Sequence, residues 1–432
     1  MMTAHQTDFS TGSVSRNILE VALPMTAAQI LNLLYNVVDR IYIGRIPGSG
    51  ALALTGVGLC FPIITFVSAF SQLFGSGGAP LCAMQRGKGD NEEAEKIMGT
   101  SFTMLCATGA IFTIAGVILH RPVLYLFGAS ESTISFASEY LTIYLCGSVF
   151  VMIALGMNPF INSQGFGRIG MATVLFGAIA NIILDPVFIF TFHMGIRGAA
   201  LATIISQFLS AVWVLKFLTG DQAVLKLRST SIPVRWNRLK KILALGSSAF
   251  IMNMTTSVVQ VVCNVTAQSY GGDLYVGVMT VLNSVREVFT MPINGLVNGA
   301  VPVMSFNYGG KAFDRVKRAI RFIFFAGIGY TALAWLSIFC FPGIFIRVFT
   351  DDAALIDAAI PSLHIYFFGF FMMSLHFVGQ QTFVALGKAG HAIFFSLFRK
   401  VMIVVPLTLI LPRLWGLGVD GVFWAEPVSN VL

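Results

Sequence analysis

Apolar stretches of about 20 residues recur along this whole chain, separated by short segments that contain Gly, Pro or charged residues. A helix of that length crosses the hydrocarbon core of a bilayer, and only helices and closed barrels satisfy their own backbone hydrogen bonds there. Of the 432 residues, 56% are hydrophobic and 11% are charged. The sequence therefore predicts an all-α polytopic membrane protein with no separate soluble catalytic domain.

The breaks between apolar stretches predict eleven full spans and the start of a twelfth. The last span begins near residue 419, and the remaining residues give only about 21 Å of helix, so we expect it to be incomplete. The predicted spans are 17–43, 52–80, 95–118, 133–158, 169–193, 198–219, 239–268, 275–305, 314–340, 354–384, 390–411 and 419 onward.

Lys and Arg are concentrated in the loops that lie on the same side of the membrane as the N-terminus, most densely between Lys216 and Lys241. Cytoplasmic loops carry such an excess, so we expect a cytoplasmic N-terminus in the plasma (inner) membrane. The same distribution accounts for the net charge of +8 without a nucleic-acid partner.

The chain also repeats itself at an offset of 222 residues, which pairs Gly77 with Gly299, Pro80 with Pro302, and Gly147 with Gly369. Each repeat holds an even number of spans, so the halves enter from the same side and are related by a pseudo-two-fold axis along the membrane normal. We predict a cytoplasmic tail (1–16), an N-lobe (17–219), a cytoplasmic linker (220–238) and a C-lobe (239–432). This parallel-repeat plan is typical of alternating-access transporters.

A few charged residues fall inside predicted spans. At mid-bilayer an ionised side chain costs about 2.5 to 3.5 kcal/mol, so each needs a partner, a water-filled cavity or a proton. They are Asp39, Arg40, Asp185, Arg286, Glu287, Arg399, Lys400 and Glu426.

Asp39 and Asp185 are the strongest candidates for a functional site. Both spans run outward, and both acids lie in the outer half of the bilayer. Tyr35 and Asn181 each precede an acid by four residues, which places them one helical turn away on the same face. Thr203 enters the same layer from the sixth span. These oxygens could bind Na⁺ or hold a proton.

The alternative is structural: Asp39 pairs with Arg40, and Asp185 caps a helix bent at Pro186. Adjacent helix residues point about 100° apart, which argues against the first pairing as the whole explanation. In the C-lobe the repeat places Val261 and Leu407 at the positions of the two acids. We expect the C-lobe charges to form a structural ion-pair set, composed of Arg286, Glu287, Arg399, Lys400 and Glu426.

Pro24 lies in the same predicted helix as Asp39, where it removes a backbone hydrogen bond and permits bending. We interpret it as a hinge for switching, with a static kink as the alternative. No phosphate-binding loop of the G-x-x-x-x-G-K type is present. The sequence therefore predicts neither an enzyme nor a cofactor other than a coupling ion.

Four segments together resemble the MATE family, the multidrug and toxic compound extrusion transporters. They are YNVVDRIYIG (35–44), NIILDPVFIF (181–190), GIRGAALAT (195–203) and WAEP (424–427). The resemblance covers nearly the whole chain and implies two six-helix lobes around a central cavity. Matching the prokaryotic DinF-like branch residue by residue, it implies an N-lobe site made of Tyr35, Asp39, Asn181, Asp185 and Thr203.

The function that this resemblance implies is export of amphipathic organic cations in exchange for H⁺ or Na⁺. Drug-like small molecules and membrane lipids would be the partners, and we expect a monomer. One alternative is a lipid-linked sugar flippase of the same superfamily, which would have more spans and a basic cavity. A second is a non-transporting membrane receptor or scaffold, against which the repeat argues.

Overall fold

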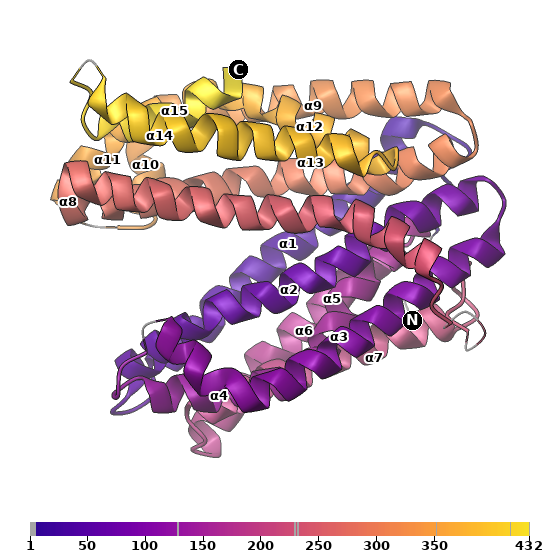
Figure 1. The fold of residues 1–432 in the computed structure, drawn as a ribbon, viewed down its shortest axis with the longest axis horizontal. Helices are drawn as coiled ribbons and strands as arrows, with labels where there is room; N and C mark the ends of the chain where they lie inside the picture. Colours follow the sequence, from indigo (N-terminus) through magenta and orange to yellow (C-terminus); the bar gives the residue numbers. More distant parts are fainter. Residues whose placement is uncertain are drawn as a thin grey trace.

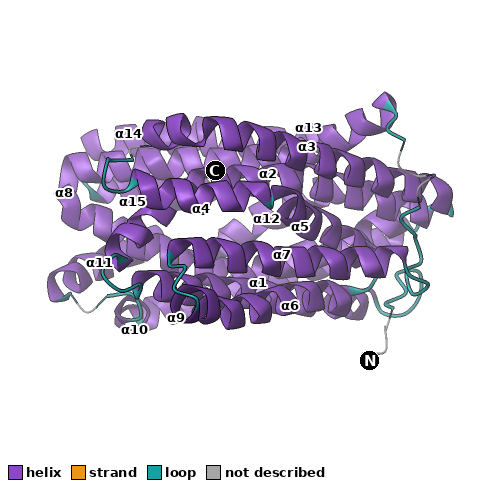
Figure 2. Ribbon diagram, turned by 90° about the horizontal axis from the view of Figure 1, so that it is seen from below, coloured by secondary structure: helices purple, strands orange, loops and turns teal. Residues whose placement is uncertain are grey.

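A computed structural model describes residues 6–127, 129–228, 230, 233–350, 352–414 and 416–431. This part of the chain is helical and contains no strand (Figure 2). Figure 1 shows two groups of helices, which we call the N-lobe (α1–α7) and the C-lobe (α8–α15).

The N-lobe helices follow the predicted spans closely, and α1 begins three residues before the predicted start. The elements are α1 (Val14–Gly44), α2 (Gly50–Gly87), α3 (Asn91–Leu126), α4 (Ile134–Cys146), α5 (Ser148–Ser163), α6 (Gly167–Pro186), the π-helical segment η1 (Val187–Thr191) and α7 (Ile196–Thr219).

The C-lobe begins with α8 (Trp236–Gly309), a helix that turns back on itself at Gly272, where φ is 70°. Both of its ends pack on the same end of α2, since Gly246 contacts Leu73 and Gly309 contacts Met84. The other elements are α9 (Phe313–Cys340), α10 (Pro342–Arg347), α11 (Ala353–Tyr366), α12 (Phe370–Ala385), α13 (Ala389–Leu397), η3 (Phe398–Val404), α14 (Val405–Ile410), η4 (Leu411–Arg413) and α15 (Asp420–Val431).

The fourth and tenth predicted spans are broken helices, which corrects the prediction of one helix each over 133–158 and 354–384. The chain bends by 57° between α4 and α5 and by 55° between α11 and α12. The breaks fall at Gly147 and Gly369, which are paired by the repeat. Equivalent bends at equivalent residues give the two halves the same internal architecture.

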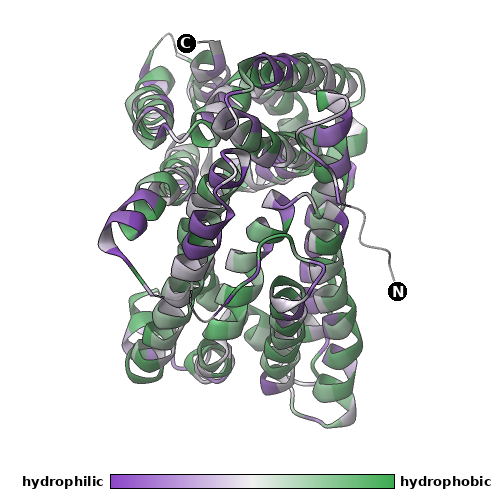
Figure 3. Ribbon diagram, turned by 90° about the vertical axis from the view of Figure 1, so that its right-hand side faces the viewer, coloured by the Kyte–Doolittle hydropathy of each residue, from purple (hydrophilic) through white to green (hydrophobic). Residues whose placement is uncertain are grey.

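Eight helices in the described part of the chain are long and apolar enough to cross a membrane, or ten if each bent pair is one span. In that number α8 is counted once, although it doubles back and supplies two spans, so the described residues contain the predicted eleven full spans. Hydrophobic residues dominate these helices (Figure 3). The protein is therefore a multi-pass membrane protein with the predicted all-α fold.

The lobes meet at one end of the molecule and splay apart at the other, on the left of Figure 1. At the closed end, glycines let backbones touch: an added Cβ at Gly87 would lie 1.9 Å from the carbonyl oxygen of Phe306, and one at Gly299 would lie 2.5 Å from Ala22 Cα. We call this contact of α1 and α2 with α8 the lobe seam.

The N-terminal segment 6–13 bridges the two lobes beside this seam. On the N-lobe side the Thr7 amide donates to the Gly165 carbonyl at 3.0 Å. On the C-lobe side Asn307 and Arg315 donate to the Phe9 carbonyl, each at 3.0 Å. Phe9 itself is fully buried. The segment that the sequence shows only as a polar tail is thus an ordered bridge.

Candidate cation site and its cavities

The structure brings Asp39 and Asp185 together inside the N-lobe. Asp39 lies on α1 and is 8% exposed, whereas Asp185 lies near the end of α6 and is fully buried. Their carboxyl groups approach within hydrogen-bonding reach of each other. Asp39 Oδ1 and Asp185 Oδ2 have no hydrogen-bond partner among the described residues. Two buried carboxylates this close repel each other, so the pair requires a cation.

Asp185 is held at a break in helical geometry. It precedes Pro186, after which the chain continues as the π-helical segment η1. Proline lacks the amide that would continue the α-helical ladder, and π-type turns are frequent at functional sites. Gly198 on α7 packs directly on this segment, since an added Cβ there would lie 2.8 Å from the Phe188 carbonyl carbon. The small residues that open α7 thus let Thr203 approach the acids.

Asn181 connects the acid to α7. Its Nδ2 lies 3.5 Å from both Asp185 Oδ1 and Thr203 Oγ1. Its own Oδ1 has no partner among the described residues, and the Thr203 hydroxyl donates to the Ala199 carbonyl. The site therefore presents several oxygen acceptors and few donors, which suits a proton or a hard cation such as Na⁺.

Tyr140 and Tyr144 also line the site, and neither was among the predicted site residues. They border a cavity of about 170 Å³ together with Tyr35, Asp39 and Arg40. Thr203 lines the same cavity. The sequence offered two signals for them: tyrosine hydroxyls in an otherwise apolar span, and a tyrosine, Tyr366, at the repeat position of Tyr144.

Arg40 does not form a salt bridge with Asp39 in the described structure. Its guanidinium lies 4.5 Å from the centroid of the Phe61 ring on α2, a cation–π contact. The helical geometry that separates adjacent side chains thus leaves the Asp39 carboxyl directed toward Asp185. The alternative in which Arg40 alone explains Asp39 does not match this arrangement.

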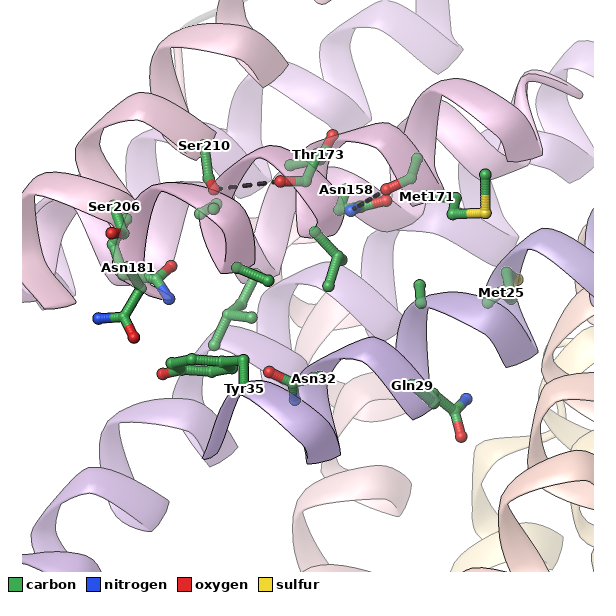
Figure 4. A pocket seen from close by; sticks show the side chains of 18 of the residues that line it. Met25, Gln29, Asn32, Tyr35, Asn158, Met171, Thr173, Asn181, Ser206 and Ser210 are labelled. Carbon is green, nitrogen blue, oxygen red and sulfur yellow. Dashed lines mark hydrogen bonds between the residues drawn. The ribbon is translucent and has the colours of Figure 1, made fainter. Parts of the chain in front are cut away.

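Two larger cavities continue from the acid pair toward the lobe seam. The N-lobe cavity, of about 240 Å³, has Gln29, Asn32 and Tyr35 of α1 on one wall, with Asn158 and Asn181 on the other (Figure 4). It shares Tyr35, Asn32 and Thr203 with the smaller cavity around Asp39. It also shares Gln29, Gln72 and Asn162 with an inter-lobe cavity of about 400 Å³. Neighbouring cavities thus share polar lining residues from Asp39 to the interface between lobes, and we call this row of three cavities the polar path.

The MatE family model matches this chain twice, over residues 24–187 and 248–410. The chain belongs to the MatE family. The two matches fall one in each lobe, as the repeat predicts.

Curated relatives of this MatE protein include the multidrug export protein MepA of Staphylococcus saprophyticus, 24% identical over 98% of this chain and 92% of the relative. MepA of Staphylococcus aureus strain MRSA252 is 24% identical over the same shares. Among solved structures, MATE in the straight conformation matches with a TM-score of 0.92 at 21% identity, covering 99% of this chain and 95% of that one. An outward-facing multidrug resistance MATE family transporter matches with a TM-score of 0.91 at 21% identity, covering 100% and 95%. These structures share the fold.

The C-lobe of this MatE protein contains a buried ion-pair cluster centred on Glu426. Its carboxylate lies 2.7 Å from Arg286, 2.9 Å from Arg399 and 3.4 Å from Lys400. The predicted ion-pair set is confirmed for these four residues. The prediction is wrong for Glu287. Its side chain is exposed, and it points about 100° away from that of Arg286, the preceding residue on the same helix.

Pro24 lies inside α1, which is one helix from Val14 to Gly44. The residues around it pack on α8: an added Cβ at Gly295 would lie 1.9 Å from the Thr26 hydroxyl. Pro24 is therefore next to the lobe seam, on the helix that carries Asp39. Its role as a hinge stays a prediction.

Proposed function

We propose that this protein is a secondary active exporter of amphipathic organic cations, coupled to H⁺ or Na⁺ through Asp39 and Asp185. The observation that carries the proposal is the buried acid pair, with unpartnered oxygens, at the end of a polar path to the lobe interface. The name of the MepA relatives, multidrug export proteins, supports the same substrate class.

The mechanism follows from electrostatics. When the lobes are splayed at the acid side, H⁺ or Na⁺ neutralises the repulsion between Asp39 and Asp185, with Asn181 and Thr203 supplying further oxygens. An organic cation in the adjoining cavity is stabilised by the same negative charge. Binding of H⁺ or Na⁺ removes part of that charge and therefore weakens the binding of the organic cation. Release of the drug and uptake of the coupling ion are therefore linked.

The proposal also includes the orientation in the membrane, the hinge and the oligomeric state. With the N-terminus in the cytoplasm of a plasma (inner) membrane, the splayed side faces outward and the lobe seam faces inward. Shifting α1 near Pro24 would change the acid site and the seam together, because one helix carries both. We propose that a monomer surrounded by lipid suffices, since both halves of the path lie within this chain.

Efflux of a fluorescent organic cation from cells tests the coupling residues. Asp39→Asn removes one negative charge with little change in shape, so we expect efflux to fall to the level of cells without the protein. Asp314→Asn is the matched control, because Asp314 lies at an exposed helix start outside the site. Normal efflux by Asp39→Asn at normal expression would overturn the assignment.

Purified protein in liposomes separates the remaining alternatives. We expect dye uptake driven by a pH gradient or by a Na⁺ gradient, and the gradient that works identifies the ion. Uptake of neither kind would favour a receptor or scaffold. Transfer of a lipid-linked sugar between leaflets, without dye transport, would favour a flippase.

A further inference from the structure

We propose that a groove between the start of α1 and the first turns of α9 binds the headgroup of an anionic phospholipid. We call it the α1–α9 groove. It encloses about 770 Å³ and lies outside the three cavities of the polar path. Residues 12–15 form its N-terminal wall. Its α9 wall consists of Arg318, Arg321, Phe322, Phe325 and Ala326.

Along the groove, the surface of α9 changes from cationic to apolar. The α9 residues of its wall are spaced at i, i+3, i+4, i+7 and i+8, so they share one face of the helix. From Phe322 to Cys340 the helix contains no charged residue, and this segment is long enough to cross most of the hydrocarbon core. Arg321 therefore lies at the level of the phospholipid headgroups, and Phe325 lies about 6 Å deeper.

The two groove arginines have no acid as an ion-pair partner in the described part of the chain. Near the starts of the two helices, Glu20 pairs with Arg16 at 2.9 Å, and Asp314 lies 4.0 Å from Lys317. Residues 12–15 add hydroxyl groups and no charge. An anion in the groove thus meets two guanidinium groups and no carboxylate. Guanidinium groups suit phosphate because they can donate two parallel hydrogen bonds to it.

The apolar end of the groove favours a phospholipid over a soluble phosphate. The Phe325 side chain is 64% exposed, one turn beyond Arg321. A soluble anion would use the arginines alone, whereas a phospholipid also covers the phenylalanines with its acyl chains. Basic pockets between transmembrane helices bind anionic headgroups in this way. A zwitterionic headgroup carries its own cation, so it is attracted less.

A hydrogen bond between the two walls holds the groove in shape. Arg315, one turn before Arg318 on α9, donates to the Gly12 carbonyl at 2.9 Å. The two walls also belong to different lobes, because α1 is part of the N-lobe and α9 is part of the C-lobe. A lipid that contacts both walls adds to the contact between lobes at the closed end. We therefore expect a bound lipid to stabilise the folded protein.

Native mass spectrometry of the purified full chain in detergent tests this inference. From an equimolar mixture of phosphatidylglycerol and phosphatidylcholine, we expect the wild-type protein to retain phosphatidylglycerol preferentially. In the double variant Arg318→Gln with Arg321→Gln, the ratio of bound phosphatidylglycerol to bound phosphatidylcholine should fall about tenfold or more, because both cations are lost. An unchanged ratio would overturn the proposal.

The control is Arg168→Gln with Lys388→Gln, which removes two positive charges at exposed positions outside the groove. We expect the control to keep the wild-type ratio. An equal fall in the control would show a general attraction of anionic lipid to the protein and would overturn the assignment to the groove. Both groove arginines are exposed. If the double variant does not accumulate, Arg321→Gln alone is judged by the same ratio.

Thermal unfolding distinguishes a lipid headgroup from free phosphate. We expect phosphatidylglycerol to raise the unfolding midpoint of the wild-type protein but not that of the double variant, and inorganic phosphate at the same concentration to change neither. A rise with inorganic phosphate that the double variant loses would identify a free-phosphate site and overturn the lipid assignment. Neither measurement requires transport, so both outcomes are independent of the proposed export.

Discussion

At the scale of single residues, charge neutralisation explains the Glu426 cluster of the C-lobe and is what the acid pair of the N-lobe requires. In the N-lobe, helical spacing alone placed Tyr35 with Asp39 and Asn181 with Asp185, so the sequence predicted which side chains share a face. It could not predict that Arg40 contacts Phe61 or that Tyr140 lines the same cavity as Thr203, because the relative rotation of these helices depends on packing.

Glu426 gives a stability prediction at this scale. It is the acid that faces three buried or half-buried cations. Glu426→Gln leaves those cations without a counter-charge, and breaking a buried pair typically costs about 3 to 5 kcal/mol. We expect a clearly lower thermal unfolding midpoint in detergent. Glu287→Gln, an exposed glutamate on a neighbouring helix, is the control and should change stability by less than about 0.5 kcal/mol. Equal midpoints for the two variants would contradict this account.

At the scale of helices, glycines determine where spans break and where they touch. The sequence predicted the positions of the spans because length and apolarity define them. It did not predict the bends at Gly147 and Gly369, since a glycine within an apolar span is also compatible with a continuous helix. The repeat places a glycine at both positions, which marked them as equivalent. Only the structure shows that the chain bends at each of them.

The N-terminal segment gives a prediction for one element. Arg315 donates to the carbonyls of Phe9, Thr11 and Gly12 at 2.9 to 3.0 Å, which fixes the segment to the C-lobe. We expect Arg315→Ala to accelerate backbone hydrogen exchange in residues 6–13 about tenfold or more, because charge-assisted hydrogen bonds are lost. Lys317→Ala is the control, since Lys317 is exposed and pairs only loosely with Asp314. Unchanged exchange in Arg315→Ala would show that Phe9 burial and the hydrogen bonds of Asn307 and Thr7 hold the segment without Arg315.

At the scale of the whole molecule, the repeat and the seam are the two features on which the proposed alternating access rests. The offset of 222 residues predicted two equivalent halves, and the doubled family match agrees with it. The sequence could not predict which end is closed, because both states of a rocking transporter are built from the same residues. Contacts such as Gly246 with Leu73 identify the closed end in this structure.

Gly246 tests whether that closed state belongs to the working cycle. An added Cβ there would lie 1.8 Å from the Leu73 carbonyl oxygen, so Gly246→Ala forces the backbones of α2 and α8 apart. In a background without the six native cysteines, we expect spin labels at Lys88 and Lys311 to show longer distances than in the protein with Gly246, and dye efflux to fall.

Gly329→Ala on α9 is the control, because an added Cβ there meets no atom within 4 Å. Since transport requires both states, a seam that cannot close stops the cycle even though Asp39 and Asp185 are intact. Unchanged distances together with normal efflux in Gly246→Ala would mean that the seam is not a gate.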